Sequence, residues 1–187
     1  WILSDADRLW HCDRKRGTAR PIERPQTLQA PLTMTRTGSQ VWMLSLNGTL
    51  ACYDLKANTF TSLLRGLTSG SAPSSRMEMV AASNGDLWIL FDRDLLRYHA
   101  SERTTERISA VPLGGADDVY TTIAIDRSDN LWIGSAKSGV TLLDGRTLTV
   151  RNLPWLELTD GRRIDRNTDI SKIYVDPHDG VWIATLT

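Results

Sequence analysis

Residues 126–135 combine a turn-forming cluster with an apolar run, in the order Asp126-Arg127-Ser128-Asp129-Asn130-Leu131-Trp132-Ile133-Gly134-Ser135. Asp, Asn and Gly tolerate the positive φ angles that tight hairpin turns require. An apolar run without alternation is typical of a strand whose two faces are both buried. The stretch therefore predicts the second strand of a hairpin, with Trp132 in the protein core.

The tryptophan of this stretch recurs along the chain. Five of the seven tryptophans lie in the same local context, namely Trp1, Trp42, Trp88, Trp132 and Trp182. The intervals between them are 41, 46, 44 and 50 residues. A period of about 45 residues fits a β-propeller blade of four short strands better than the shorter helical repeats. The unusual composition, with seven Trp against two Phe, is therefore a signature of the repeat, and we expect the repeated Trp to be core residues.

Each period divides into four expected strands, of which the second is apolar throughout and the fourth alternates polar and apolar, as an outer edge strand does. The expected strands are residues 32–36, 41–46, 49–54 and 59–64 in one period, 77–82, 86–91, 95–99 and 104–111 in the next, and 120–126, 131–135, 139–144 and 147–152 in the third. No segment of the sequence has the 3.6-residue period of an amphipathic helix.

We therefore predict an all-β chain: a β-propeller of which about four blades of four antiparallel strands are present. The expected repeats cover residues 1–27 (partial), 28–68, 74–113, 118–156 and 168–187 (partial). Because the repeats begin and end at a second strand, they fit a piece of a larger propeller. A closed ring of four blades is the alternative.

Length and charge exclude several classes of protein. The 187 residues correspond to about one domain. Twenty-two Lys and Arg balance twenty-two Asp and Glu, so the basic excess expected of a protein that binds nucleic acid or an anionic membrane is missing. No run of eighteen apolar residues occurs, and the N-terminal stretch does not resemble a signal peptide.

The two cysteines do not predict a disulfide or a metal site. Cys12 and Cys52 form no C-x-x-C or Cys/His pattern. When residues 9–13 and 50–54 are aligned as equivalent strands, the two thiols are one position apart and face opposite sides of their sheets. We expect two buried free thiols.

The repeat resembles the two-component regulator propeller repeat, which runs Asp-x-x-Gly-x-Leu-Trp-Ile-Gly-Thr, with Gly-Leu and Tyr-Asp a few residues later. The matching stretches are residues 126–135 with 139–140 and Asp144, residues 176–185, and more loosely residues 84–89 with 96–99 and 41–43 with 52–54. The resemblance covers essentially the whole chain.

The sequence also departs from this repeat. Leu44 and Leu90 stand where the repeat has a small residue, and residues 37–39 have lost the Asp. The WD-repeat signature is absent, since no Gly-His pair and no Trp-Asp dipeptide occur in the sequence.

The resemblance implies the periplasmic sensor region of a hybrid two-component sensor histidine kinase, of the kind found in Bacteroidetes and anchored in the inner membrane. It implies blades that belong to a seven-bladed propeller, a second propeller and further domains in the parent protein, and a homodimeric parent. The implied signal is an oligosaccharide. We expect this segment to need no cofactor, to bind no nucleic acid and to make no direct membrane contact.

No catalytic constellation stands out. The three histidines are scattered, and no Ser nucleophile elbow or phosphate-binding loop is present. Loop carboxylates could be paired for glycoside hydrolysis, but such groups are more often solvated. We expect no catalytic residue, no metal ligand and no enzymatic activity in this segment, the histidine kinase lying elsewhere in the parent. The alternatives are a propeller enzyme, a glycan lyase or hydrolase, and a purely structural interaction propeller.

Ligand contacts are expected from loops at one end of the blades, where the strand order places both the connections between blades and the turns between second and third strands. The candidate residues are Trp155, Asp160, Arg162, Arg163, Arg166, Lys137, Arg76, Asp117 and Asp118. An aromatic ring stacks on a sugar face, and charged groups hydrogen-bond to its hydroxyls or acidic substituents. The alternative is that Trp155 fills space below a long loop at 154–168, while the arginines face solvent or a second propeller.

An open piece of a propeller exposes unpaired strand edges and apolar faces, which promote aggregation. We therefore expect the 187 residues, expressed alone, to be poorly soluble or oligomeric. Size-exclusion chromatography with light scattering and thermal unfolding measures this directly. A sharp monomeric peak with cooperative melting would contradict the expectation.

Overall fold

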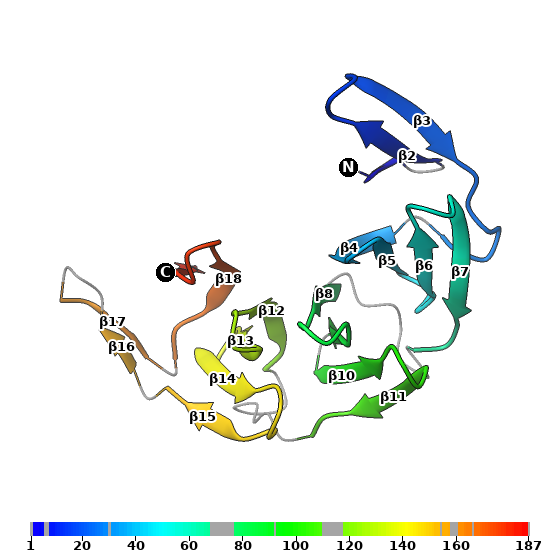
Figure 1. The fold of residues 1–187 in the computed structure, drawn as a ribbon. Coiled ribbons are helices and arrows are strands. Elements are labelled where there is room, and N and C mark those ends of the chain that lie inside the picture. Colours follow the sequence, from blue (N-terminus) through cyan, green and yellow to red (C-terminus); the bar gives the residue numbers. More distant parts are fainter. Residues whose placement is uncertain are drawn as a thin grey trace. The chain divides into compact units, whose positions relative to one another are not determined.

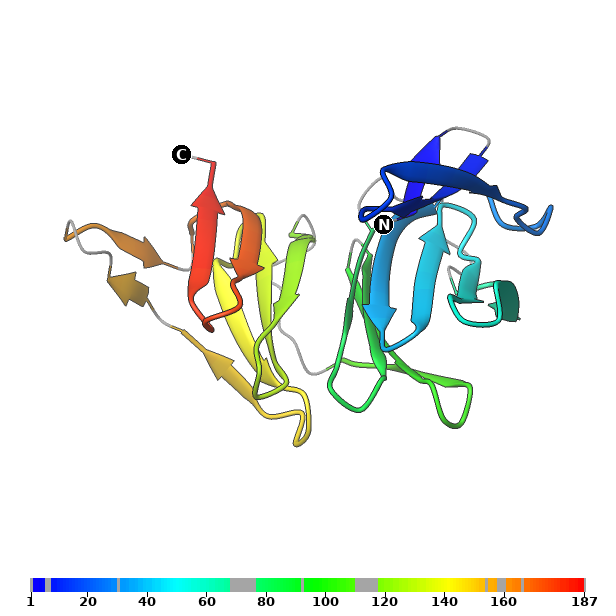
Figure 2. The same ribbon diagram turned by 45° about the horizontal axis from the view of Figure 1, so that its top comes forward.

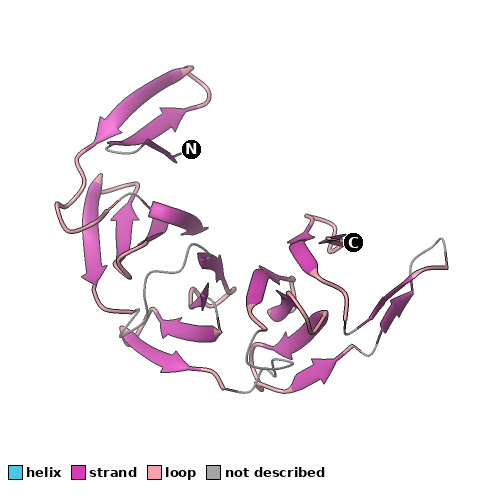
Figure 3. Cartoon of the chain, turned by 180° about the vertical axis from the view of Figure 1, so that it is seen from behind, coloured by secondary structure: helices cyan, strands magenta, loops and turns pink. Residues whose placement is uncertain are grey.

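The computed structural model of the chain describes residues 2–5, 8–29, 31–67, 77–91, 93–109, 118–153, 155–157, 161–165 and 167–186. Every regular element in these ranges is a β-strand (Figure 3), which confirms the all-β prediction. The strands belong to two compact units, Trp1–Ser75 and Arg76–Thr187. Among the residues described, no helix is available that could cross a membrane.

The first unit contains two antiparallel sheets of consecutive strands, drawn in blue and cyan in Figure 1. One has the order β1-β2-β3 and the other the order β4-β5-β6-β7. Their strands are β1 Ile2–Asp5, β2 Arg8–Asp13, β3 Thr18–Ile22, β4 Pro31–Thr37, β5 Gln40–Ser45, β6 Leu50–Asp54 and β7 Thr59–Leu64. Their core includes Leu9, Leu28, Met43 and Tyr53.

The second unit contains two complete four-stranded sheets, β8-β9-β10-β11 and β12-β13-β14-β15, and two hairpins, β16-β17 and β18-β19. The strands are β8 Met77–Ala81, β9 Leu87–Phe91, β10 Asp94–His99, β11 Thr104–Arg107, β12 Tyr120–Ile125, β13 Asn130–Ser135, β14 Val140–Asp144, β15 Val150–Asn152, β16 Trp155–Glu157, β17 Arg163–Asp165, β18 Ile170–Val175 and β19 Val181–Thr185. β12 contacts both β8 and β18, so the first strands of three sheets are neighbours (Figures 1 and 2).

The expected strands agree with the observed ones to within one residue at nearly every end. Two ends differ by more. The strand expected over 104–111 ends at Arg107, and the one expected over 147–152 begins at Val150. The second difference has a local cause, because Asp144 accepts hydrogen bonds from the amides of Arg146 and Thr147. Leu148 then adopts a φ of 58°, which prolongs the turn.

The repeated tryptophans occupy one register position, opposite the first strand of their own sheet: Thr35↔Trp42, Val80↔Trp88, Ala124↔Trp132 and Tyr174↔Trp182. Their burial differs. Trp42 and Trp88 are 4% and 1% exposed, Trp132 is half-buried, and Trp182 is 65% exposed. The prediction that these rings are core residues is confirmed for the first two and wrong for Trp182, while Trp1 lies outside the described residues.

The burial of each ring in the second unit depends on the sheet that follows it. Trp88 packs in one cluster with Leu131 and Leu143 of the next sheet, and Trp132 packs against the cluster around Ile173 of β18. Covering a Trp removes on the order of 200 Å² from water and contributes several kcal/mol. Among the described residues, no further sheet covers Trp182, so its ring stays in solvent.

Aspartates at the start of two hairpin turns orient the tryptophan rings. Asp126 accepts two turn amides with one carboxylate oxygen and the indole N–H of Trp132, at 3.2 Å, with the other. Asp176 does the same, with the indole N–H of Trp182 at 2.8 Å. This indole bond, followed by the turn amides, holds the pKa of Asp176 below its usual range. The Asp and the Trp of the repeat are therefore one structural unit.

A second aspartate of these turns joins neighbouring sheets, in a contact that we call the turn clamp. Asp129 accepts hydrogen bonds from the Ser83 amide at 2.8 Å and the Ser83 hydroxyl at 2.5 Å. Asp179 accepts the Arg127 amide at 3.1 Å. Both aspartates have positive φ angles, 64° and 70°. The clamp therefore recurs between successive sheets of the second unit.

Gly134 explains the small residue of the repeat. A Cβ atom at this position would lie 2.6 Å from Cγ2 of Ile170 and 2.8 Å from Cγ2 of Thr122. Any side chain here would push β18 away from the sheet β12–β15. The backbone of Gly134 is not in the left-handed region, so its conformation does not require a glycine. The glycine is needed instead because the two sheets approach closely at this position.

The cysteines differ in burial. Both are free thiols; Cys52 is buried in β6, and burial raises the pKa of its thiol. Cys12 in β2 is only half-buried. The expectation of a buried thiol is confirmed for Cys52 and wrong for Cys12.

Replacing Asp129 with Asn tests the turn clamp without disturbing the backbone, because Asn also tolerates a positive φ. Hydrogen bonds to a charged group contribute about 1.5–3 kcal/mol. We expect Asp129→Asn to lower the free energy of unfolding by about 1–2 kcal/mol at pH 7, measured by urea denaturation. Glu102→Gln, at an exposed carboxylate of the β10–β11 turn, is the control and should leave the value unchanged.

The difference in unfolding free energy between wild type and Asp129→Asn should also depend on pH. Burial alone would raise the pKa of Asp129, but the hydrogen bonds from Ser83 and the Arg146 guanidinium outweigh it and hold the pKa below its usual value. The unfolded chain therefore binds the proton more readily, so this stabilisation is present above about pH 4 and is lost as the pH falls through the folded pKa. The stability difference between wild type and Asp129→Asn should narrow in acid. An undiminished difference at low pH contradicts the clamp.

Candidate functional site

Connections between sheets and turns between second and third strands meet at one end of the second unit, as the strand order predicted. Asp118, just before β12, accepts hydrogen bonds from the Lys137 amide at 2.9 Å and from the Ser138 hydroxyl. Lys137 and Ser138 belong to the turn between β13 and β14. The carboxylate of Asp118, a residue only 1% exposed, therefore fixes the turn that carries Lys137.

The neighbouring sheet contributes a second cation to this end. Arg93, in the turn between β9 and β10, donates through its guanidinium to the backbone carbonyl of Asp118. The Ala136 amide also donates to the Val119 carbonyl at 3.0 Å. Arg93 and Lys137 are exposed. We call Arg93, Asp118, Lys137 and Ser138 the loop-end cluster: two exposed cationic residues held around one buried carboxylate.

Tyr120 lies directly beside the cluster at the start of β12. Burial raises the pKa of its phenol to about 12; the charges of Asp118 and Asp94 act in the same direction, and Arg93 acts against them. The phenol is therefore neutral at physiological pH. A buried neutral phenol suits a packing role rather than proton transfer.

The segment expected to be one long loop, 154–168, contains the hairpin β16–β17. Leu156 is paired with Ile164, and Ile164 is buried in the cluster that includes Ala124 and Ile170. One apolar side chain therefore anchors the hairpin, whereas a loop was expected here because the segment connects the fourth strand of one blade to the first strand of the next. Figures 1 and 2 show the hairpin as an arm beside the strands β12–β15.

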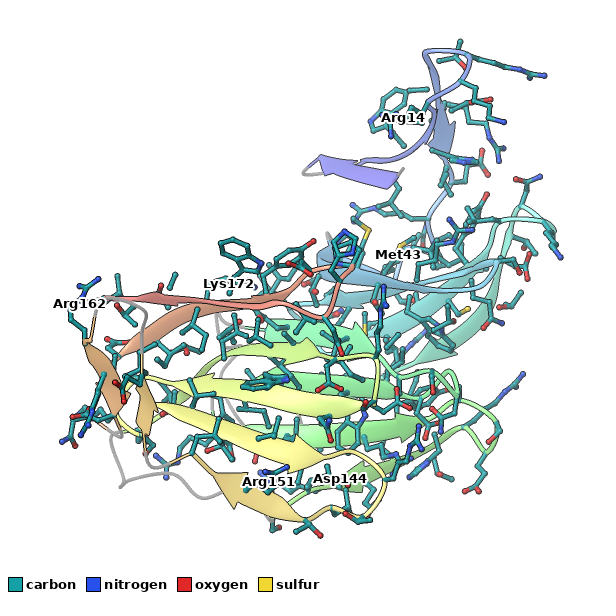
Figure 4. All side chains as sticks on the ribbon, turned by 60° about the vertical axis from the view of Figure 1, so that its left-hand side comes forward. Arg14, Met43, Asp144, Arg151, Arg162 and Lys172 are labelled. Carbon is teal, nitrogen blue, oxygen red and sulfur yellow. The ribbon has the colours of Figure 1, made fainter. Side chains whose placement is uncertain are left out.

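The arginines of this hairpin remain on its surface. The Arg163 guanidinium lies 4.0 Å from the Glu157 carboxylate across the hairpin, and both side chains are exposed. Arg162 is exposed at the hairpin tip (Figure 4). Trp155 is paired with Asp165 through the backbone, but its side chain lies outside the described part of the structure. Exposed ion pairs of this kind contribute little to stability.

The structure thus brings together two of the sequence-predicted residues, Asp118 and Lys137, and places Arg162 and Arg163 on a separate hairpin. Four further candidates, Arg76, Asp117, Asp160 and Arg166, lie outside the described residues.

A polar group that the sequence interpretation missed links three first strands. The Thr122 hydroxyl and the Ile123 amide each donate to one Glu78 oxygen at 2.9 Å, and the Lys172 ammonium donates to the other. Figure 4 shows Lys172 on β18. The Ile173 amide donates to the Thr122 hydroxyl oxygen at 3.3 Å.

The sequence held a signal for this group. Glu78, Thr122 and Lys172 each lie two residues before the partner of the repeated Trp. A Glu, a Thr and a Lys at one repeat position of strands that are otherwise largely apolar indicate a shared polar contact. The pattern becomes visible only when the first strands of successive repeats are aligned with one another.

The chemistry available at the described surface is hydrogen bonding and charge. Within the described ranges, no group of three or more His, Cys, Asp and Glu side chains is arranged to hold a metal ion. Every buried side-chain nitrogen and oxygen described has a hydrogen-bond partner. The exposed Lys and Arg residues at the loop end and on the hairpin can donate hydrogen bonds to hydroxyls, carboxylates or sulfates.

Comparison with known proteins identifies the fold. No family model matches the chain, and no curated protein matches it. Two structures of the extracellular domain of BT4673 from B. thetaiotaomicron, called a one component system in one and a hybrid two component system in the other, align at TM-score 0.52. Their identities are 15% and 14%, and each alignment covers 98% of this chain and 30% of that one.

Two further solved structures align at TM-score 0.68. They are the β-propeller domain of Cps50 (Swd1) from Myceliophteria thermophila, at 13% identity over 98% of this chain and 58% of that one, and U3-55K, at 12% identity over 98% and 55%. The chain therefore spans less than two thirds of each of these structures. At such identities the likeness concerns the fold, and the sheets described above are blades of a β-propeller.

Replacing Asp118 with Ala removes the acceptor for the Lys137 amide and the Ser138 hydroxyl. Leaving buried donors unpaired costs about 1–3 kcal/mol, so we expect that loss of unfolding free energy and, in hydrogen exchange, about tenfold faster exchange of the Lys137 amide. The control is Asp13→Ala, at a carboxylate that accepts two amides of a turn in the first unit. If Lys137 keeps its protection in Asp118→Ala, the loop-end cluster is not held by this carboxylate.

Proposed function

We propose that this chain is part of the extracytoplasmic sensor region of a two-component signalling protein and that it takes part in recognising oligosaccharides. The proposal rests chiefly on residues 126–135 and 176–185, which resemble the two-component regulator propeller repeat. In both copies the Asp and the Trp of the repeat are joined by a hydrogen bond. The Asp and the Trp that carry the resemblance are therefore also in contact with each other in this chain.

The comparison with BT4673 supports the same class of protein. Its structures are of an extracellular domain, and one of them is described as a hybrid two component system. Under the proposal, the parent of this chain is anchored in the inner membrane, is a homodimer, and carries a second propeller, further domains and a histidine kinase. The present blades then belong to a seven-bladed ring in the periplasm.

The described repeat residues have structural roles, whereas exposed charged residues lie on the connections between strands. This arrangement favours sensing over catalysis. Repeat residues such as Asp126, Asp129 and Trp132 are engaged in holding turns and sheets. Rigid strands thus carry loops whose side chains are free to vary, which is the usual arrangement of a binding scaffold. Lys137 and Arg163 are exposed cations on such connections.

The ligand contacts of the proposal come from these loops. Lys137, Arg162 and Arg163 bind sugar hydroxyls or acidic substituents, and Asp118 positions the turn of Lys137. The other proposed contacts are Trp155, Asp160, Arg166, Arg76 and Asp117. A purely structural role is the second candidate, and the exposed aromatic pair Tyr174 and Trp182 on β18–β19 favours it.

Calorimetric titration of the complete protein with a panel of neutral and acidic oligosaccharides tests the proposal. We expect at least one to bind, and Lys137→Ala and Arg163→Ala each to weaken binding about tenfold, or about 1.4 kcal/mol. Lys56→Ala and Arg151→Ala are the matched controls: both residues are exposed, one on the β6–β7 turn and one on an outer strand. These two control variants should bind the oligosaccharide with the affinity of the wild type.

Three results would overturn the sensing proposal. Absence of binding across the panel favours the structural role. If all four variants weaken oligosaccharide binding equally, the binding site is not at the proposed loops. If chromatography shows that a bound oligosaccharide is converted to products, the protein is an enzyme instead.

A further inference from the structure

The balance of charge in the chain is the sum of two unbalanced parts. The first unit, Trp1–Ser75, contains nine Lys and Arg residues against five Asp and Glu residues, whereas Arg76–Thr187 contains thirteen against seventeen. The first unit by itself therefore has an excess of positive charge, which is the property expected of a part of a protein that binds an anionic surface.

Three turns of the first unit meet at one end of its sheets, namely the turns β2–β3, β4–β5 and β6–β7. The Leu55 amide donates to the Ser39 carbonyl at 2.8 Å, which joins the β6–β7 turn to the β4–β5 turn. The Arg20 guanidinium of β3 donates to the side-chain oxygen of Asn58, which joins the first sheet to the β6–β7 turn. Side chains on these turns therefore reach solvent at the same end of the unit.

Exposed cations gather at this end, in a group that we call the basic turn face. Its members, all of them exposed, are Arg14, Lys15, Arg16, Arg20, Arg36 and Lys56. Figure 4 shows Arg14 on the hairpin β2–β3. Because these residues come from both sheets of the unit, the basic turn face is an array of cations rather than a charged run in one loop.

The carboxylates at this end are engaged with the backbone. Asp13 accepts the amides of Lys15 and Arg16, at 2.9 and 3.2 Å, and so fixes the turn that carries these two cations. Asp54 likewise accepts two amides of the β6–β7 turn, at 2.7 and 2.9 Å. Glu23 follows the opposite end of β3. The turn end of the unit therefore has more positive than negative charge.

The basic turn face has no apolar or aromatic anchor among the residues described. Leu32 is an exposed large apolar side chain of this unit, but it lies at the start of β4, whereas the other end of β4 reaches the turn. Phe60, just past the β6–β7 turn, packs edge-on against Tyr53, with 5.1 Å between the ring centroids. Protein interfaces centre on apolar or aromatic anchors, and sugars and unpaired bases are bound by stacking on an exposed ring. The face therefore fits a partner that is recognised by charge.

We propose that the basic turn face binds the surface of an anionic lipid bilayer, through the phosphates of its headgroups. Clusters of about four to eight Lys and Arg residues are typical of sites that bind anionic lipid. Side chains from several turns at one end of a unit can reach a flat surface together. A face without an apolar anchor stays at the level of the headgroups.

The composition of the whole chain predicts no membrane contact, because the carboxylates of the second unit cancel the positive excess of the first. Attraction to a charged surface acts within about one Debye length, about 8–10 Å at moderate salt. The charge of the face that approaches the bilayer is therefore the relevant quantity. Such binding does not depend on the proposed sensor function.

Flotation of the full 187-residue chain with lipid vesicles tests the proposal. One set of vesicles is phosphatidylcholine, and the other is phosphatidylcholine and phosphatidylglycerol in equal parts. Flotation is chosen because aggregated protein sinks. We expect at least about tenfold stronger partitioning to the anionic vesicles, and loss of this preference when the salt is raised from about 0.1 M to about 1 M, since the Debye length then falls to about 3 Å.

Two sets of substitutions in the β2–β3 turn separate charge from geometry. Arg14→Gln, Lys15→Gln and Arg16→Gln, combined in one variant, should weaken partitioning to the anionic vesicles at least about tenfold. Arg14→Lys and Arg16→Lys, combined in another, keep the charge. The second variant should partition as the wild type does, because attraction to a charged bilayer does not require the planar fork of a guanidinium.

A further triple variant matches the first in net charge but not in position. It combines Arg65→Gln, just past the end of β7 that lies away from the basic turn face, with Arg103→Gln and Arg151→Gln in the second unit. All three residues are exposed. This variant should partition to the anionic vesicles as the wild type does.

Four results would overturn the proposal. Equal partitioning to neutral and anionic vesicles shows that charge does not drive binding. Equal weakening by the two triple variants places the contact elsewhere. Loss of binding in the Lys variant indicates a discrete anion held by guanidinium forks. Binding of dextran sulfate or duplex DNA, without binding of anionic vesicles, assigns the face to a soluble polyanion.

Circular dichroism checks that each variant keeps its strand structure. If the triple variant of the β2–β3 turn does not fold, Arg14→Gln combined with Lys56→Gln takes its place, because these exposed residues lie on two different turns of the face. This double variant should also weaken partitioning to the anionic vesicles, and unchanged partitioning contradicts the proposal.

Discussion

Burial of a tryptophan ring by the sheet that follows it is the constraint on which the second unit depends. Trp88 and Trp132 lie at the same place in their own hairpins, yet each is covered by side chains of the next sheet. In the second unit the burial of these rings involves the next sheet, so stability comes from neighbours, as in other repeat proteins. Trp182 shows the consequence, because its position is the same and its ring is exposed.

Carboxylates make this stacking specific. Apolar contact fixes no angle between two sheets, whereas the bonds from Ser83 to Asp129 and from Arg127 to Asp179 fix which turns meet. Glu78 does the same at the first strands, where it is bound by Thr122 and by Lys172. Polar groups thus select one arrangement among many that would bury the same rings.

The repeat residues that hold the sheets together lie apart from the residues at the loop end. The turns with Asp126 and Asp176 lie at the end of the sheets opposite to the turn that holds Lys137, because each strand reverses the chain. Residues at the loop end can therefore change without disturbing the clamps. A propeller scaffold combines constant sheets with variable connections for this reason.

Strand positions could be predicted from the sequence because period, turn residues and apolar runs are local properties. The strands at residues 59–64 and 77–81 illustrate the agreement. The hairpin β16–β17 could not be predicted, since only the packing of Ile164 into a distant cluster orders its short strands. Of the candidate site, the meeting of Asp118 with Lys137 follows from strand order, whereas the Glu78 group required the register of three sheets.

The sequence by itself determined an all-β chain built from a repeat of about 45 residues, because turn chemistry and side-chain alternation act over a few residues. Only the tertiary structure decided which tryptophans are buried and which carboxylate joins which sheet. Those outcomes depend on what lies across from a residue in space. Identical repeat positions, such as Trp88 and Trp182, therefore end in opposite environments.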